Sequence, residues 1–522
     1  MLKQSHLQPV RSGRLTHGRG SLKMFARTSG ASVDSQSSEM ERSRGRQSPR
    51  DPPATRAGAR LGGQSHVLET AGFGLRSPGG RFAGGSRGEP VLTDVPSPPV
   101  PGQQHDPRVV ADAIHGVVKL WTSLRGTCGW LARTWGVVIG PDTIRHGLSR
   151  LGCHLLRRPL ERRDDWVVIL DHTMQLGTSR CLLVLGLPLR SWQAEGGALK
   201  HRNLHVLMVE VVTSSTGAVV HDPLRRLVAR IGVPAQIVSD SGGDLAKGIA
   251  LLRDEHPEIV DTSDITHKLA CLLKAELEHD ARWEEYVRLA GRTRALLQQA
   301  RGGVPSPPSL RTKARYQNLE GLVVWGEAIG RLAADAGSVG RLAVQRGTTP
   351  DGAGRWFAEM VGWVEDFARD LASWRSLLTI IATTRGQVLD DGLHADSSRI
   401  LRRRLRPIDA RGRRFTAATL TFVARESHRV PRGQRYVGCS DVIESVFGKY
   451  KSYLERSPSP SLGSNVLLFP LFVTRITVEL VRDAMTAVKQ RTAQLLARTL
   501  GGPSQKQRQK ELRSAPQDTK PA

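Results

Sequence analysis

Cysteine, aromatic residues and long apolar runs are scarce in this 522-residue sequence. The five cysteines are scattered and include no Cys-x-x-Cys pair, which argues against a zinc site or a disulfide framework and favours a reducing compartment. The longest apolar runs, 182–189 and 466–473, are too short to span a bilayer, and the N-terminus lacks the apolar core of a signal peptide. We therefore expect a cytoplasmic protein that does not bind a membrane.

Acidic residues are few relative to basic ones. The 76 Lys and Arg residues outnumber the 49 Asp and Glu residues, so the formal net charge is +27. Residues 1–100 hold 15 basic and 7 acidic side chains, which leaves +19 for the rest of the chain. A basic excess spread in this way predicts a polyanionic partner with strongly salt-dependent binding, and we expect the protein to act at the nucleoid. The alternative explanation is an Arg-rich genome.

Composition divides the chain into four regions. Residues 1–105 are rich in Arg, Ser, Gly and Pro and show no periodicity, which predicts a disordered basic tail. Residues 106–162 have a helical pattern, and 163–456 contain strands followed by helices. Residues 457–522 predict a C-terminal helix, from Val473 to about Leu500, and a polar tail.

Within 106–162, the segments 128–136 and 142–151 resemble a helix-turn-helix. Asp142 is expected to cap the second helix, from which Arg145 and Arg150 could contact DNA in a groove. The alternative is a plain helical hairpin.

A mixed sheet is expected from about residue 164. Strands are predicted at 166–171, 180–189, 204–213, 236–239 and 258–264, and helices at 222–231 and 241–252. Three strands, helix, strand, helix, strand is the order of an RNase H-like α/β sheet. Residues 281–435 then predict a large all-α insertion.

Three carboxylates stand out in this region. Asp171 follows the apolar run 166–170, Asp240 follows the predicted strand 236–239, and Glu444 lies in a predicted helix at 440–451. Carboxylate oxygens are ligands for hard divalent cations, and two such cations about 4 Å apart can clamp the attacking and leaving oxygens of a phosphodiester. Taken singly, each residue reads as a turn aspartate or a solvated glutamate.

The order Asp171, Asp240, Glu444, with spacings of 69 and 204 residues, resembles that of the DDE transposases of bacterial insertion sequences. The resemblance covers about 164–290 and 436–455. It implies an RNase H-like core in which the three carboxylates bind two Mg²⁺ or Mn²⁺ ions. The implied reaction is DNA strand cleavage and strand transfer at the element ends. The implied partners are double-stranded DNA, from element ends and target, and a second copy of the chain in a homodimeric synaptic complex.

Further residues enter through the same resemblance. Asp264-Ile-Thr-His267 resembles an Asp-x-x-His element of transposases with all-helical insertions, which would place Asp264 and His267 beside the active site. The alternative is a helix cap and a satisfied histidine. In several such families an insertion tryptophan stacks on a flipped base. The insertion here contains four, each of which could equally be a core anchor: Trp325, Trp356, Trp363 and Trp374.

Basic residues near the predicted site could contact DNA phosphates. Lys451 follows Glu444 by seven residues, so both lie on one helix face, and Lys449 is close by. Arg403 lies in the run 402–406, which could line a DNA channel or form an exposed loop. Two alternative functions stay open: an RNase H-like DNA endonuclease without strand transfer, and a non-catalytic DNA-binding derivative of a transposase.

Overall fold

The computed structural model describes residues 100, 104–176, 179–197, 199–299, 303–309, 319–456, 462–501 and 509. The described residues belong to one compact unit. Apart from residues 100, 104 and 105, the predicted disordered tail lies outside the described residues, as does the predicted polar tail beyond 501 except for residue 509.

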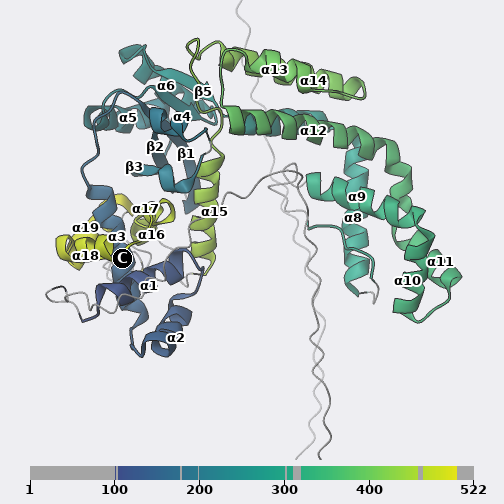
Figure 1. Ribbon diagram of the computed structural model, residues 1–522, viewed down its shortest axis with the longest axis horizontal. Coiled ribbons are helices and arrows are strands. Elements are labelled where there is room, and N and C mark those ends of the chain that lie inside the picture. The colour runs from purple at the N-terminus through teal and green to yellow at the C-terminus, as the bar shows by residue number, and fades with distance from the viewer. Residues whose placement is uncertain are drawn as a thin grey trace, which may run out of the picture. The chain divides into compact units, whose positions relative to one another are not determined.

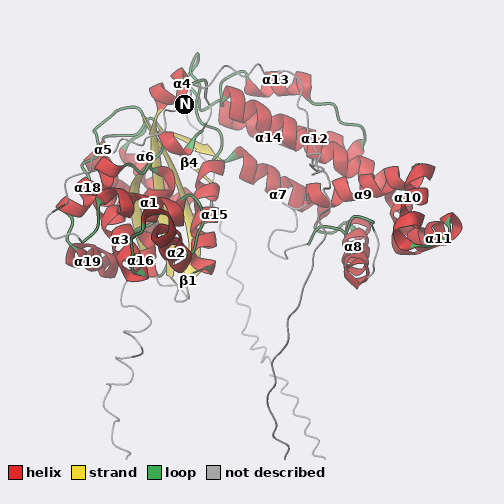
Figure 2. Ribbon diagram, turned by 60° about the horizontal axis from the view of Figure 1, so that its bottom comes forward, coloured by secondary structure: helices red, strands yellow, loops and turns green. Residues whose placement is uncertain are grey.

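A mixed sheet forms the centre of the α/β region (Figures 1 and 2). Within the described residues it has five strands in the order β3-β2-β1-β4-β5. The strands are β1 (Trp166–Leu176), β2 (Ser179–Pro188), β3 (His205–Val212), β4 (Gln236–Ser239) and β5 (Val260–Ser263). The pairs β1–β2 and β2–β3 are antiparallel, whereas β1–β4 and β4–β5 are parallel. The predicted α/β class, with three strands, helix, strand, helix, strand, is confirmed.

The two faces of the sheet bury alternate residues of β1. Val168 and Leu170 pack with α5 (Gly217–Ile231) and α6 (Gly243–Glu255). Val167 and Ile169 belong to the larger core that includes α7 (Ile265–Leu277) and α15 (Asp441–Glu455). Because successive side chains of a strand point to opposite faces, helices on both sides account for the unbroken apolar run at 166–170.

The described part of the connection between α7 and α15 consists of helices joined by loops, with one isolated β-bridge between Leu393 and Tyr436. It comprises α8 (Ala281–Gln299), α9 (Leu319–Ala334), α10 (Ala336–Arg346), α11 (Pro350–Val361), η3 (Gly362–Phe367), α12 (Ala368–Asp391), α13 (Ser397–Arg404) and α14 (Ala410–Ser427). Tyr286 lies at the centre of an aromatic cluster there, formed with Trp283, Trp325, Trp363, Phe367 and Trp374. Three of the four candidate base-stacking tryptophans thus serve as core anchors. The fourth, Trp356, is partly buried and lies under the Arg346 guanidinium, 3.7 Å from its ring centroid.

The N-terminal and C-terminal helices pack against each other. They are α1 (Pro107–Val118), α2 (Leu124–Trp135), α3 (Pro141–Arg157), α16 (Leu462–Val466), α17 (Phe469–Val473), α18 (Val478–Ala487) and α19 (Gln490–Gly501). The single helix predicted from Val473 to Leu500 is wrong. Thr477 starts a new helix by accepting a hydrogen bond from the amide of Leu480, and the chain leaves helical geometry again at Val488.

Two shorter elements, α4 (Leu189–Ala194) and η1 (His201–Asn203), connect β2 to β3. None of the described helices has the length and apolar character that a membrane crossing requires.

Candidate functional site

Asp171 lies inside β1 rather than at its end. The strand continues to Leu176 because it stays paired with β2, where Leu183 is opposite Asp171. The parallel pairing with β4 ends earlier, with Ile169 opposite Val238. The expectation that Asp171 ends its strand is therefore wrong. Next to it, β4 has stopped and its chain turns away at Asp240.

The surroundings of Asp171 disfavour its charged form. Burial, followed by the negative charge of Asp240, raises the pKa of Asp171 to about 7, and Glu444 and Asp264 act in the same direction. A hydrogen bond from the backbone amide of His172 to Oδ1 of Asp171, 2.6 Å long, opposes the rise. The four carboxylates thus share one electrostatic environment.

A tight turn carries Asp240. Its Oδ1 accepts a hydrogen bond from the Gly242 amide at 2.9 Å, and Ser241 between them has a φ of 62°. Gly242 is the N-cap of α6, and no side chain caps this helix. The carboxylate of Asp244 instead lies 3.6 Å from Nδ1 of His172.

Three pairs of residues connect the segment before α15 to β4 and to the start of α7. The side chain of Gln236, in β4, accepts from the amide of Val437 at 3.0 Å and donates to its carbonyl at 2.6 Å. The amide of Ile265 donates to the carbonyl of Gly438 at 3.0 Å. The Asp264 carboxylate accepts from both the amide, at 3.1 Å, and the hydroxyl of Ser440, the N-cap of α15.

Glu444 projects from the first turn of α15, which packs beside β1 (Figure 1). Val442, Ile443 and Phe447 are buried, as the sequence predicted, whereas Glu444 itself is exposed. Although the side chain reaches solvent, partial burial and the charges of Asp264 and Asp441 raise the pKa of Glu444. The positive charge of Lys451 opposes the rise, in agreement with a shared helix face.

The donor chemistry of this site fits a hard divalent cation. Asp171, Asp240 and Glu444 offer only carboxylate oxygens, the ligands that Mg²⁺ and Mn²⁺ prefer. After burial, the repulsion from the other carboxylates contributes to the raised pKa of Asp171, and a bound cation relieves repulsion of this kind. As the side chains stand, no three His, Cys, Asp or Glu residues of the described chain are arranged as a metal-binding group. Binding would therefore require the carboxylates to draw together.

The predicted neighbours of the site have different surroundings. Asp264 is buried and caps α7 by accepting from the amide of His267 at 3.1 Å, and its charge adds to the rise in the pKa of Asp171 and of Glu444. His267 is exposed and lies close enough to Glu444 to act on its pKa. Lys451 is exposed, whereas Lys449 is half-buried, and burial lowers its pKa.

The remaining predicted DNA contacts do not gather around the carboxylates. Arg403 is exposed on α13, and Arg145 is exposed on α3 and paired with Asp142. Gly140, not Asp142, is the N-cap of α3. The guanidinium of Arg150 donates to the carbonyls of Met485 and Val488, at 2.6 Å for the latter, and thereby holds the end of α18.

Sequence reasoning missed the residues that assemble the site. Gln236 is a polar residue in an apolar strand, which is the one signal that a motif search could have used. Ser440 carries no local signal, because its partner Asp264 is distant in sequence.

The chain was also compared with known proteins. No family model matches the sequence, and no curated protein matches it. Among solved structures, the chain is similar to the Drosophila P element transposase in its strand transfer complex. The TM-score is 0.36 and the identity 13%, over 73% of this chain and 94% of that one.

Proposed function

We propose that this protein is a DDE-type transposase with an RNase H-like core, which cleaves DNA at the ends of an insertion sequence and transfers the strands to a target. The observation that carries the proposal is the shared environment of Asp171, Asp240 and Glu444, which come from β1, the end of β4 and α15. Hydrophobic packing of the sheet and α15 accounts for the fold, but it does not call for three carboxylates that repel one another. Such an arrangement is typical of a functional site.

Each carboxylate has its own part in this proposal. Asp171, whose pKa both other carboxylates raise, would contribute to both metal positions, and Asp240 and Glu444 would each complete one of them. Bound Mg²⁺ or Mn²⁺ would supply Lewis-acid activation of the attacking hydroxyl and stabilisation of the leaving oxygen. Because the pKa of Asp171 is about 7, this group must lose its proton before it can act as a ligand. Lys451, on the face of Glu444, would hold a DNA phosphate.

The same site is compatible with two other functions. An RNase H-like endonuclease would cut DNA without joining it to a target, and a derived DNA-binding protein would do neither. We expect double-stranded DNA as substrate, a homodimer in the complex that joins two ends, and a place at the nucleoid. The net charge of +27 favours a polyanionic substrate in each case.

Cleavage of DNA that carries the gene's own flanking sequences tests the proposal. Wild type, Glu444→Gln and Glu455→Gln are compared with Mg²⁺ or Mn²⁺; Glu455 is an exposed carboxylate on the same helix and serves as the matched control. Wild type and Glu455→Gln should nick the flanks at defined positions, whereas Glu444→Gln should bind the DNA without cutting it. Wild-type cleavage by Glu444→Gln would refute the assignment. Products joined to a second DNA separate a transposase from an endonuclease.

A further inference from the structure

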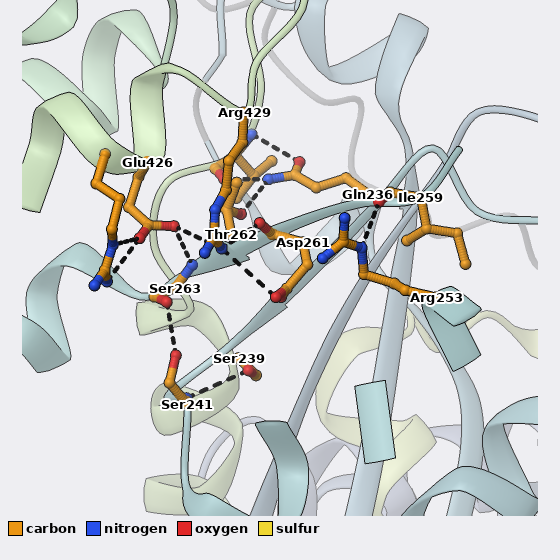
Figure 3. Close-up of polar contacts among 12 residues, drawn as sticks. Gln236, Ser239, Ser241, Arg253, Ile259, Asp261, Thr262, Ser263, Glu426 and Arg429 are labelled. Atoms are coloured by element: carbon orange, nitrogen blue, oxygen red, sulfur yellow. Dashed lines mark hydrogen bonds and ion pairs between the residues drawn. The ribbon is translucent and has the colours of Figure 1, made fainter. Parts of the chain in front are cut away.

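Glu426 is a buried carboxylate outside the three already discussed. It lies near the end of α14, is 0% exposed, and is surrounded by hydrogen-bond donors (Figure 3). Its Oε1 accepts from Nε of Arg425 at 2.9 Å, and its Oε2 accepts from Nη1 of Arg429 at 3.3 Å and from the amide of Ser263 at 2.9 Å. A buried charge is tolerated only with such partners, so this carboxylate holds the end of β5 in a defined place.

The end of β5 in turn contacts the turn that carries Asp240. Ser263 is paired with Ser239, the last residue of β4, and the hydroxyl of Ser241 donates to the hydroxyl of Ser263 at 2.7 Å (Figure 3). Ser241 directly follows Asp240 and has a φ of 62°, a left-handed conformation that is unfavourable for a residue with a side chain. The hydrogen bond to Ser263 compensates for this conformation and keeps the turn in place.

Arg429 strengthens the same connection. Besides Glu426, its guanidinium donates to the carbonyl of Asp261 at 2.8 Å and lies 3.5 Å from the Asp261 carboxylate. Arg429 and Glu426, at the end of α14, therefore bind two residues of β5, Asp261 and Ser263. The last helix before the Glu444 segment is thus linked to the Asp240 turn.

We infer that Glu426, Ser263 and Ser241 are positioning residues that set the Asp240 carboxylate for metal binding. The inference rests on the proposed function, in which Asp240 is a metal ligand. Glu426 acts through Ser263, and Ser263 acts through the Ser241 hydroxyl. Loss of an outer partner of this kind lowers metal affinity by about 10-fold to 100-fold in characterised metal sites.

Mn²⁺ binding to the full chain without DNA, measured by calorimetry, tests the inference. Ser263→Ala removes the hydroxyl acceptor, and Ser263→Thr keeps it at a strand position where a β-branched residue is favourable. We expect the dissociation constant for Mn²⁺ to rise at least about tenfold in Ser263→Ala and to remain near the wild-type value in Ser263→Thr. Ser241→Ala removes the donor from the other side and should reproduce Ser263→Ala.

Glu426→Gln should weaken Mn²⁺ binding in the same direction. Glu327→Gln is its matched control, because Glu327 also accepts two hydrogen bonds from an arginine, Arg375, at 2.7 and 2.6 Å, but on α9. Cleavage assays should show a higher half-saturating Mn²⁺ concentration for Ser263→Ala and a maximal rate close to wild type. A purely structural role would lower the melting temperature and leave the Mn²⁺ dissociation constant unchanged.

The outcomes separate this inference from the proposed function. Wild-type Mn²⁺ affinity in Ser263→Ala and Ser241→Ala, or equal losses in Ser263→Ala and Ser263→Thr, would overturn the inference alone. Absence of Mn²⁺ binding by the wild-type protein would overturn the proposed metal site and the inference with it.

Discussion

Asp171→Asn is expected to stabilise the folded protein at neutral and alkaline pH. The folded protein raises the pKa of Asp171 from 3.8 to about 7, so ionising this carboxyl opposes folding. A difference of about three units at about 1.36 kcal/mol per unit corresponds to roughly 4 kcal/mol, an order-of-magnitude figure. Asparagine keeps the oxygen that accepts from the His172 amide and removes the charge that Asp240 and Glu444 repel.

The sign of the effect follows from the direction of the pKa shift. The folded-state pKa lies above the unfolded value, so the contribution of Asp171 to stability is fully present below about pH 4 and is lost as the pH rises through about 7. The difference in the free energy of unfolding between Asp171→Asn and wild type should therefore be small near pH 4. It should grow to roughly 4 kcal/mol at about pH 8.

Urea denaturation of both proteins between about pH 4 and about pH 8 measures this difference. Asp165→Asn is the control of opposite sign. Burial alone would raise the pKa of Asp165. Hydrogen bonds from Arg163, at 2.8 Å, and from the Arg190 amide, at 3.2 Å, outweigh burial and lower this pKa. Asp165→Asn should lose stability relative to wild type as the pH rises above about 4.

Mn²⁺ should reduce the difference in the free energy of unfolding between Asp171→Asn and wild type. The reason is that Mn²⁺ binds the folded wild-type protein, and not the variant, and so stabilises only the wild type. The reasoning would be refuted if the gap between Asp171→Asn and wild type were independent of pH. It would be refuted equally if Asp171→Asn became the less stable protein at alkaline pH.

Four further substitutions test other parts of the structure. Asp264→Asn should lower stability by about 1–3 kcal/mol and slow cleavage, since it weakens the link to Ser440; unchanged unfolding and cleavage would contradict this role. Trp374→Ala should cost about 3–5 kcal/mol in urea denaturation, as a core tryptophan does, and an unchanged midpoint would exclude the core role. Arg150→Ala should lower stability by about 1–3 kcal/mol and leave DNA affinity unchanged. Arg145→Ala should weaken DNA binding without a loss of stability. Fluorescence anisotropy with labelled DNA at several salt concentrations distinguishes the two variants.

Local patterns were sufficient for the order of elements in the sheet region. The apolar runs and their breaks predicted β4 at Gln236–Ser239 and placed the other strand bounds close to the observed ones, except the end of β1, which lies at Leu176 rather than Asp171. Asp240 follows β4 as predicted, because the turn signal Ser-Gly-Gly lies next to it in the sequence. The aromatic cluster shows the limit of such patterns, since burial around Tyr286 depends on helices that are far apart in the chain.

The sequence by itself determined the α/β class and the mainly helical connection between α7 and α15. It also determined the choice of Asp171, Asp240 and Glu444 as candidates. All three results depend on periodicity and turn residues, which are patterns only a few residues long. Only the tertiary structure decided that β1 extends past Asp171, since pairing with β2 sustains it. It also decided the role of Arg150 and the break before α19. The placement of α15 beside the sheet was decided in the same way, since Gln236 and Asp264 bind a segment that is distant in sequence, at Val437 and Ser440. Contacts of this kind leave no periodicity in the chain, so their partners emerge only once the sheet and α15 are packed together.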